Sequence, residues 1–341
     1  MKDKRVLITG VCGTVGRELL RQVVEEKPAE IIGLDNNESE LFFMMDEYRS
    51  MPHVRLYLGD IRDRDNMIRK MSGIDIVLHA AALKHVILGE QSPRDVVQTN
   101  VLGTQNIIDA AITNEVERVL FTSSDKAVNP TNVMGTSKLM GERLMTAANS
   151  VRRGDRPIFA STRFGNVLGS RGSVIPVFKR QIQRGGPVTL TEPSMTRFIM
   201  TLEEAVALVM RSVFLAKGGE VFVTKMPVVR IADLAAVMVG ELAPRYGHSP
   251  DEVRINVVGS KAGEKVYEEL INEEETRRSA EIERYFVVLP AFESVYEDID
   301  HTYPGMEEVG VKLPYNSSVE PHMDKEELRK YLTKNRLLEG E

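Results

Sequence analysis

Short runs of apolar residues alternate with longer stretches of helical periodicity through the first half of the chain. Five runs, most of them apolar at successive positions, predict β-strands at Arg5–Thr9, Glu30–Leu34, Val54–Leu58, Ile74–His79 and Val119–Ser123. Successive rather than alternating apolar positions indicate burial on both faces of a strand, as in a parallel sheet. The intervening stretches predict helices over Thr14–Glu25, Arg64–Met71, Pro93–Asn114 and Val133–Ala147. We therefore expect an α/β fold in which a doubly wound parallel sheet carries helices on both faces.

The second half of the chain follows a different pattern. Five glycines between residues 165 and 186 indicate loops and turns rather than another strand–helix–strand unit. The further predicted elements are helices over Leu202–Leu215 and Ile231–Leu242 and a strand over Val221–Val223 that returns to the main sheet. Residues 264–309 are rich in Glu and Asp, which indicates a solvated face.

Composition and charge exclude several classes of protein. The 44 Lys and Arg and the 50 Asp and Glu give a net charge of −6, which provides no broad attraction to nucleic acid or to an anionic membrane. The single cysteine, Cys12, excludes intrachain disulfides and cysteine-based zinc sites, and the 6 histidines lack metal-ligand spacing, so we predict no metal. No apolar run approaches the ~20 residues of a membrane helix, and the apolar stretch behind the charged N-terminus is too short for a secretory signal. We expect a soluble, cytoplasmic protein.

Three glycines, Gly10, Gly13 and Gly16, directly follow the first predicted strand and open a helix. At this spacing they allow a sharp turn, the approach of backbone N–H groups to a pyrophosphate, and close packing of the helix on the sheet. Asp35 ends the second strand 19 residues beyond Gly16, where a carboxylate binds the ribose 2′-hydroxyl of NAD. No Arg or Lys lies between residues 33 and 47 to neutralise a 2′-phosphate, so NAD is favoured over NADP. The alternatives are a tight turn without a cofactor and, for Asp35, a loop carboxylate that begins a turn.

The spacing Gly-x-x-Gly-x-x-Gly resembles that of the short-chain dehydrogenase/reductase superfamily, and so do Gly59-Asp60-Ile61, His79-Ala80-Ala81-Ala82 and Asn100. The resemblance implies a Rossmann-like fold that binds NAD. The cofactor contacts it implies are Gly10, Cys12, Gly13, Thr14, Val15, Gly16, Asp35, Asn36, Asp60, Ile61, Ala80, Ala81, Ala82, Lys84, Asn100 and Lys138.

A length of 341 residues suggests about two domains. We assign residues 1–165 to an NAD-binding Rossmann domain, to which residues 200–225 return. Residues 166–341 then form mainly a smaller, interleaved C-terminal lobe that binds the substrate.

The end of the fifth predicted strand carries residues suited to catalysis. Thr122-Ser123-Ser124-Asp125-Lys126 lies at the carboxyl edge, where open α/β sheets place their chemistry. Met134-Gly135-Thr136-Ser137-Lys138 occupies the position of the superfamily's Tyr-x-x-x-Lys motif, although a thioether has no ionisable proton. Together these segments resemble the UDP-N-acetylglucosamine 4,6-dehydratases of bacterial polysaccharide biosynthesis, in a short soluble form; some members carry Met in place of the Tyr. Further matches at residues 83–86, 163–176, 195–201 and 263–270 extend the resemblance over about residues 4–272.

This resemblance implies a reaction and roles for the residues. The reaction is dehydration of an NDP-N-acetylhexosamine, UDP-N-acetylglucosamine above all, to a 4-keto-6-deoxy sugar nucleotide, with NAD as a transient hydride carrier. Asp125 is the implied acid for the hydroxyl that leaves carbon 6, and Lys126 the implied base at carbon 5, a pairing that can invert this carbon. The base for the carbon-4 hydroxyl stays open: Lys138 is the nearest candidate, alone or through water or Ser124, while Met134 packs against the nicotinamide. The alternative is an ordinary loop ion pair between Asp125 and Lys126.

The resemblance also implies a set of substrate-binding residues. They are Lys84, Ser123, Ser124, Lys126, Asn166, Ser173, Val174, Arg197, Lys261 and Glu264. Relatives carry Arg at the position of Lys261, and Lys keeps the charge but loses the bidentate fork for a diphosphate. Two other functions stay open: a sugar-nucleotide 4- or 5-epimerase of the same superfamily, and a catalytically silent NAD-binding sensor, which the missing Tyr favours. The implied partners are a nucleotide-sugar substrate and further copies of the chain in a homo-oligomer, a dimer or higher.

Overall fold

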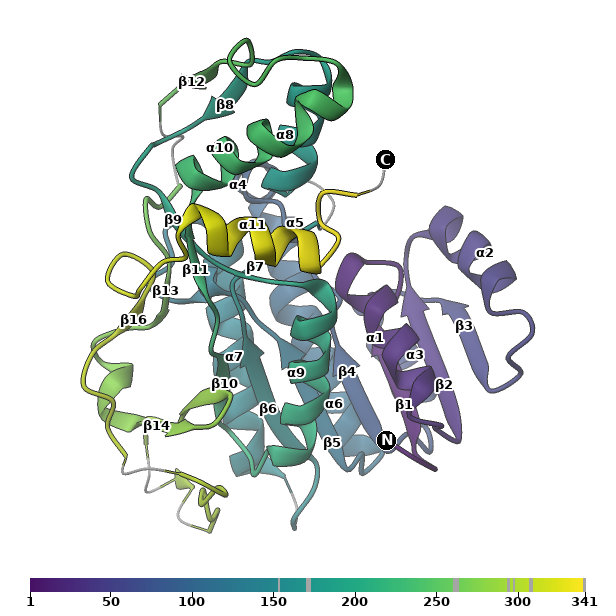
Figure 1. Cartoon of the computed structure of the whole chain (residues 1–341). Helices are drawn as coiled ribbons and strands as arrows, with labels where there is room; N and C mark the ends of the chain where they lie inside the picture. The colour runs from purple at the N-terminus through teal and green to yellow at the C-terminus, as the bar shows by residue number, and fades with distance from the viewer. Residues whose placement is uncertain are drawn as a thin grey trace. The chain divides into compact units, whose positions relative to one another are not determined.

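The chain forms two compact units in the computed structural model (Figure 1). The structure describes residues 1–152, 154–169, 173–259, 264–292, 295–296, 298–306 and 309–339. Unit 1 consists of Met1–Phe164, Val206–Thr224 and Ile271–Pro314, and unit 2 of Gly165–Ala205, Lys225–Leu270 and Tyr315–Glu341. Neither unit is therefore a continuous piece of sequence.

Unit 1 is built on a 9-stranded sheet with the strand order β14-β15-β10-β6-β5-β4-β1-β2-β3. Its strands are β1 (Arg5–Thr9), β2 (Glu30–Asp35), β3 (Val54–Leu58), β4 (Ile76–His79), β5 (Arg118–Thr122), β6 (Ile158–Arg163), β10 (Val221–Thr224), β14 (Ser279–Ile282) and β15 (Tyr285–Val288). The strands from β10 to β3 are parallel, whereas β15 is antiparallel to β10 and β14 to β15. The strand order reverses between β1 and β4, and ligands of such sheets bind beside this point at the carboxyl ends of the strands.

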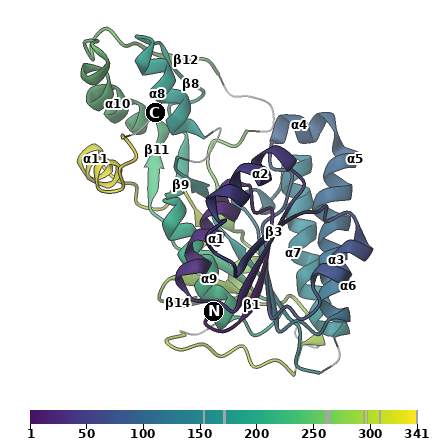
Figure 2. The same cartoon turned by 90° about the vertical axis from the view of Figure 1, so that its right-hand side faces the viewer.

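Helices cover both faces of this sheet. They are α1 (Thr14–Glu25), α2 (Glu38–Glu47), α3 (Arg64–Lys70), α4 (Val86–Gln91), α5 (Pro93–Val96), α6 (Gly103–Thr113), α7 (Val133–Val151) and α9 (Leu202–Leu215). Figure 2 shows α3, α6 and α7 on one side of the sheet and α1 and α9 on the other. On the first side, buried strand residues such as Val77 and Phe121 join one apolar cluster with the helices. Asn37, Asp63 and Asn132 cap the first turns of α2, α3 and α7 with their side-chain oxygens.

The α/β fold with a doubly wound, mostly parallel sheet is confirmed. The five strands predicted in the first half are β1 to β5, each within two residues of the predicted bounds. The single helix predicted over Pro93–Asn114 is interrupted by a π-helical turn, η1 (Val97–Leu102). Asn100 is buried in this turn and binds Leu83 and Ser137 with its side chain. Single π turns of this kind are frequent at functional positions.

The interpretation of residues 264–309 as a solvated face holds only in part, because acids such as Glu273, Glu274 and Glu283 are exposed but others are buried. Strands β14 and β15 extend the main sheet, and Glu275 in the 3₁₀ turn η4 (Glu275–Arg278) is only 3% exposed. Consequently Ile271–Pro314 belongs to unit 1 and not to the C-terminal lobe. The physical reason is that Glu275 pairs with Arg163, a partner more than a hundred residues away in the chain. Local acidic composition predicts exposure because charged residues are seldom buried without a partner.

Unit 2 contains small sheets and three longer helices among its described residues. The strands are β7 (Asn166–Val167), β9 (Thr196–Met200) and β11 (Val228–Arg230) in one sheet, β8 (Val188–Leu190) with β12 (Ile255–Val257), and β13 (Glu269–Ile271) with β16 (Tyr315–Asn316). Phe178 of α8 (Val174–Gln183), Met238 of α10 (Ile231–Leu242) and Leu332 of α11 (Lys325–Lys334) lie in one buried cluster. No helix in the described stretches of the chain is long and apolar enough to cross a membrane.

His79 is fully buried at the carboxyl end of β4, as the sequence predicts. Its Nδ1 lies 2.7 Å from Thr9 Oγ1, and its Nε2 lies 3.1 Å from Thr104 Oγ1. Burial, aided by the charge of Lys138, lowers the pKa of His79 to about 3. The folded protein therefore holds this imidazole neutral far below its ordinary range.

We predict that acid destabilises the fold in part through His79. Below a pH of about 6.5 the unfolded chain binds a proton at this residue and the folded chain does not, so stability falls with pH. His79→Gln keeps a polar side chain but cannot titrate, which removes this contribution. Denaturant unfolding at about pH 6 and about pH 5 should show the wild type losing about 1 kcal/mol more than the variant. Equal losses would contradict the prediction.

Candidate active site

The glycine-rich loop between β1 and α1 packs against the end of β4. A Cβ on Gly10, whose φ is +70°, would lie 2.7 Å from the Ala81 backbone, and one on Gly16 would lie 2.0 Å from the Gly10 carbonyl oxygen. Gly13 is the N-cap of α1. Apart from its neighbours in the chain, a Cβ there would meet only the Gly10 oxygen, at 3.2 Å, among the described atoms within 4 Å. The backbone at Gly13 therefore leaves room at the N-terminus of α1, and Thr14 and Val15 continue it in the first turn. Such a site fits a pyrophosphate.

Asp35 stands beside this loop at the end of β2. Its Oδ2 accepts a hydrogen bond from the Cys12 N–H at 2.9 Å, and its Oδ1 accepts one from the Asn37 N–H at 2.9 Å. Burial, together with the charge of Asp35, raises the pKa of the Cys12 thiol to about 12. Cys12 is therefore a protonated, unreactive part of the loop at neutral pH.

Two further residues predicted to contact the cofactor meet at the end of β3. Asn36 hydrogen-bonds the Asp60 carboxylate, which also forms an ion pair with Arg62 at 2.5 Å. The hydrogen bonds from Arg62 hold the pKa of Asp60 below its ordinary value. Ile61 is buried next to this carboxylate and contributes to the apolar core.

Arg17 is a cation near the loop that the sequence analysis missed. Residues 33–47 contain no Arg or Lys, but Arg17 reaches this region from the first turn of α1. It pairs with Glu40 at 2.7 Å and Glu47 at 3.6 Å, both on α2. Arg17 and Asp35 both act electrostatically on Cys12, so they share one neighbourhood. Two carboxylates thus compensate the guanidinium.

Asn100 fixes the segment that follows β4. Its Oδ1 accepts a hydrogen bond from the Leu83 N–H at 2.8 Å, and its Nδ2 donates to the Leu83 carbonyl at 2.9 Å and to Ser137 Oγ at 2.8 Å. The side chain thereby ties this loop to α7. Residues 80–82 are partly exposed and Lys84 is exposed, so this edge of the sheet is open to solvent.

Lys138 and Met134 lie one turn apart on α7, and both are buried. The Lys138 Nζ donates to the Thr122 carbonyl oxygen at 2.8 Å and lies 4.6 Å from the centre of the Phe121 ring. Burial lowers the pKa of Lys138 to about 8, an effect that Glu142 opposes. Met134, only 4% exposed, offers a thioether that cannot take up a proton.

Ser124, Asp125 and Lys126 form a connected acid–base group just beyond β5, where Asp125 and Lys126 begin the 3₁₀ turn η2 (Asp125–Ala127). The Ser124 hydroxyl donates to Asp125 Oδ1 at 2.6 Å, and Lys126 Nζ lies 2.9 Å from Asp125 Oδ2. The Asp125 side chain is 3% exposed and that of Lys126 is 35% exposed. The carboxylate is therefore shielded while the amine reaches solvent.

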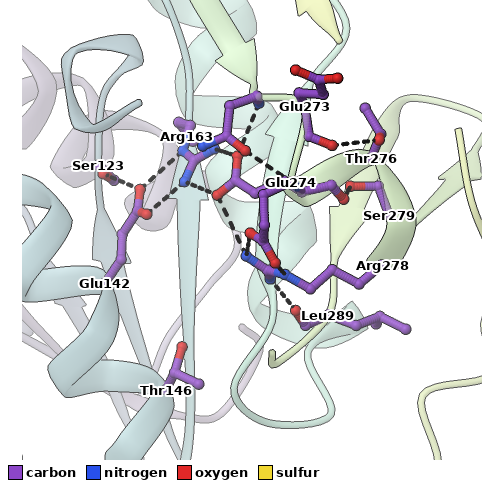
Figure 3. Close-up of polar contacts among 12 residues, drawn as sticks. Ser123, Glu142, Thr146, Arg163, Glu273, Glu274, Thr276, Arg278, Ser279 and Leu289 are labelled. Atoms are coloured by element: carbon purple, nitrogen blue, oxygen red, sulfur yellow. Dashed lines mark hydrogen bonds and ion pairs between the residues drawn. The ribbon is translucent and has the colours of Figure 1, made fainter. Parts of the chain in front are cut away.

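A buried ion network supports this stretch of chain (Figure 3). Arg163 Nη2 lies 2.6 Å from Glu142 Oε2, and its Nη1 lies 2.9 Å from Glu275 Oε2. Glu142 Oε1 also accepts a hydrogen bond from the Ser123 hydroxyl at 2.5 Å. Burial alone would lower the pKa of the Arg163 guanidinium, but the two carboxylates raise it. The sequence analysis did not select Glu142 or Glu275; Arg163, the last residue of the buried strand β6, is the charge that requires these partners.

In unit 2, three residues predicted to bind substrate gather around one carboxylate. Asn166 Nδ2 donates to Glu268 Oε2 at 2.8 Å, and Arg197 Nε lies 3.2 Å from Glu268 Oε1. Glu264 lies 3.9 Å from Arg197. The Glu268 backbone N–H in turn donates to Ser317 Oγ at 2.9 Å. Glu268, which is 6% exposed, is thus the centre of this group, and the sequence analysis missed it.

The remaining substrate-binding predictions lie at the start of α8 or outside the description. Ser173 is the N-cap of α8 and Val174 its first residue. The Ser173 hydroxyl oxygen is buried and has no hydrogen-bond partner among the described residues. Lys261 lies outside the described residues.

Known proteins resemble this chain over most of its length. The model of a family described as polysaccharide biosynthesis protein matches residues 6–290. An uncharacterized membrane protein of Methanocaldococcus jannaschii is 47% identical, over 97% of this chain and 96% of that protein. A UDP-N-acetylglucosamine 4,6-dehydratase (inverting) of Campylobacter jejuni is 36% identical over 91% and 90%, and a UDP-glucose 4-epimerase of Rickettsia canadensis is 38% identical over 83% and 82%. The X-ray structure of a Bacillus thuringiensis protein called Pen matches with a TM-score of 0.90, at 40% identity over 99% of each chain.

We predict that no side chain is tolerated at Gly135, because α7 lies very close to the backbone of Lys126 there. A Cβ there would lie 2.2 Å from the Lys126 carbonyl oxygen. Gly135→Ala should therefore lower the free energy of unfolding by roughly 1–3 kcal/mol, as overpacking does. The matched control is Gly240→Ala in α10, where a Cβ meets no described atom within 4 Å; it should stabilise by about 0.5–1 kcal/mol. Denaturant unfolding measures both, and equal stability of the two variants would contradict the close approach.

Proposed function

Because the chain belongs to the polysaccharide biosynthesis protein family of the short-chain dehydrogenase/reductase superfamily, we propose that it is a nucleotide-sugar 4,6-dehydratase. The proposed substrate is an NDP-N-acetylhexosamine, in the first place UDP-N-acetylglucosamine. The proposed product is the 4-keto-6-deoxy sugar nucleotide, inverted at carbon 5.

The observation that carries this proposal is the Asp125–Lys126 pair. Loss of water across carbons 5 and 6 needs a base at carbon 5 and an acid at the hydroxyl of carbon 6. A carboxyl group and an amine 2.9 Å apart at the carboxyl edge of the sheet supply both. Sugar epimerisation at carbon 4 needs no such pair, because no hydroxyl leaves.

Proton transfer within the pair lets it supply both the acid and the base for the elimination. When the Lys126 ammonium gives a proton to the Asp125 carboxylate, the pair becomes an amine and a carboxylic acid. The amine then takes the carbon-5 proton, and the acid protonates the departing hydroxyl. Elimination thus returns both residues to the ammonium and carboxylate that form the observed ion pair. Saturation of carbon 6 then requires one proton at carbon 5, and the proton that Lys138 takes from the carbon-4 hydroxyl balances it. Ser124, which donates to Asp125, keeps the carboxyl group oriented throughout.

We propose NAD as the cofactor, held by the glycine loop and by Asp35. A bound nicotinamide supplies the transient hydride acceptor that this chemistry requires. The backbone at Gly13 supports the pyrophosphate, and Asp35 supports the ribose hydroxyls. A 2′-phosphate would meet the Asp35 carboxylate, and Arg17, a cation of the same neighbourhood, is already paired with Glu40 and Glu47. NAD is therefore favoured over NADP.

Lys138 is the proposed base for the carbon-4 hydroxyl. Met134 cannot act in this role, whereas a lysine with a pKa of about 8 is neutral in about a tenth of molecules near pH 7. The hydrogen bond from Lys138 to the Thr122 carbonyl fixes its nitrogen at the end of β5. Lys84 and Ser124 are proposed to contact the sugar from the same edge of unit 1, whereas the Ser123 hydroxyl is buried and donates to Glu142.

In unit 2, Asn166, Arg197 and Lys261 are proposed to bind the nucleotide diphosphate, and Ser173, Val174 and Glu264 to contact other parts of the substrate. Arg197 supplies the charge, and Glu268 orients it together with Asn166. We also propose a homo-oligomer, because Leu102 of η1 and Met140 of α7 leave large apolar side chains about half exposed.

We predict that the protein converts UDP-N-acetylglucosamine in deuterated water to a product that is lighter by one water and carries deuterium at carbon 5. Lys126→Ala should abolish the incorporation of deuterium, because no other group is assigned to that proton, while NAD binding is retained. Mass spectrometry and NMR of the product provide the measurement. An epimerase would conserve the mass of the sugar nucleotide, a silent cofactor sensor would give no product, and retained exchange in the variant would exclude Lys126 as the base.

We predict that log kcat/KM rises with pH and levels off near pH 8. The neutral amine of Lys138 is the active form, so its population falls about tenfold for each pH unit below its pKa. Lys138→Arg, which stays protonated throughout this range, should lose turnover at every pH while still binding NAD. Initial rates from about pH 6 to about pH 9 test this. A rate that is independent of pH over this interval would remove Lys138 from the role of base.

A further inference from the structure

Two acids and one arginine are buried next to residues 123–126, which we call the reaction segment. All three are at most 3% exposed. They are Glu142 on α7, Arg163 at the end of β6 and Glu275 in η4. Removing such charges from water is costly, and apolar residues often replace buried ion pairs without loss of stability. The network is therefore poorly explained by stability alone, and its contacts indicate what else it does.

The network and the residues beside it bind the backbone that carries the Asp125–Lys126 pair. The residues on either side of Arg163 bind this backbone: the Thr162 carbonyl accepts the Ser123 N–H at 2.7 Å, and the Phe164 carbonyl accepts the Asp125 N–H at 3.1 Å. The Ser123 hydroxyl donates to Glu142, which Arg163 holds through two hydrogen bonds at 2.6 and 3.0 Å. Figure 3 shows Glu142 between Ser123 and Arg163.

The same face of α7 makes a second contact with the end of β5, one helical turn before Glu142. Lys138 and Glu142 are four residues apart, so they lie above one another on the helix. Lys138 binds the Thr122 carbonyl, and Glu142 binds the next residue, Ser123, through its hydroxyl. Helix α7 therefore binds Thr122 and Ser123, the two consecutive residues that lead toward Asp125. We call these contacts the clamp.

We propose that Glu142 and Arg163 are positioning residues for the reaction, and that Glu275 locks Arg163 in place from the C-terminal part of unit 1. The clamp fixes the backbone of residues 123–125 and so the direction in which Asp125 and Lys126 present their protons. This inference rests on the proposed function for its kinetic consequences, but its structural consequences are independent of it.

Glu142 also has an electrostatic role. Lys138 faces Glu142 on its own helix, His79 on β4 and the Phe121 ring on β5. His79 is neutral, so the charge of Glu142 is what opposes the effect of burial on the pKa of Lys138. Loss of this charge should move the titration of Lys138 below pH 8, whereas a change of position alone should leave it in place.

Two conservative substitutions separate charge from position. Glu142→Gln keeps the shape and an acceptor for Ser123 but removes the charge, and Glu142→Asp keeps the charge but withdraws the carboxylate by one methylene. We expect Glu142→Gln to shift the rise of the pH–rate profile to lower pH. We expect Glu142→Asp to leave that rise in place and to lower kcat by about tenfold to a hundredfold, with little change in KM. Wild-type kcat and an unmoved profile in both variants would overturn the proposal.

Glu275 and its neighbour Glu274 provide a matched pair. Glu274 lies on the same turn but is exposed and pairs with Arg278 (Figure 3). Glu275→Gln should lower kcat by about tenfold or more, because Arg163 loses one of its two anchors, whereas Glu274→Gln should leave kcat unchanged. Equal effects of the two substitutions would show that Glu275 has no special link to the reaction segment.

Hydrogen–deuterium exchange tests the clamp without reference to any reaction. In Ser123→Ala, which leaves all three charges in place, amides 123–126 should exchange at least about tenfold faster while those of β1 and β4 stay protected. Uniformly faster exchange throughout the sheet, or unchanged exchange at 123–126, would overturn the positioning role. If wild-type protein dehydrates no sugar nucleotide, the proposed function fails, and this exchange pattern still decides whether the clamp exists.

Discussion

The buried charge of Arg163 is the constraint on which the rest of unit 1 depends. A guanidinium that is 1% exposed cannot remain in an apolar interior without carboxylates, and an uncompensated buried charge costs several kcal/mol. Glu142 must therefore come from α7 and Glu275 from η4, and Arg278 adds a second positive charge 3.8 Å from Glu275. The return of residues 271–289 to the main sheet brings Glu275 to Arg163 and pairs β15 with β10.

The same constraint organises the carboxyl edge of the sheet. Strands β5 and β6 run parallel, so residues 162–164 lie beside residues 122–125 and accept their N–H groups. Helix α7 binds this edge through Lys138 and Glu142, and Asn100 joins it to the loop after β4. The glycine loop closes on the neighbouring strand end with no space for a Cβ at Gly10 or Gly16. Catalytic and cofactor-binding candidates are thus held by backbone contacts between strand ends, which a parallel sheet supplies without long loops.

Sequence reasoning was strongest where the informative residues are close together in the chain. The glycine spacing and Asp35 follow from local patterns, and a family resemblance selected Asp125, Lys126 and Lys138. In the structure Asp35 binds the glycine loop at Cys12, and Asp125 pairs with Lys126. Sequence reasoning was weakest for the buried acidic residues. Glu275 and Glu268 were lost within a Glu-rich stretch that predicts exposure, yet each is buried against an arginine, Arg163 and Arg197 respectively. Arg17 was missed for a related reason, since it reaches Glu40 across the space between two helices.

The sequence by itself determined the parallel α/β sheet, the glycine loop and the residues able to exchange protons, because period, spacing and side-chain chemistry are local properties. Tertiary structure alone decided which charges are buried, and with them the protonation of Lys138 and the path of residues 271–314. A pKa and an ion pair depend on distance and on the exclusion of water, and local sequence patterns specify neither of these two quantities. Glu142 shows the difference: in the sequence it is one more acid on a helix, and in the fold it joins Ser123 to Arg163 beneath the acid–base pair.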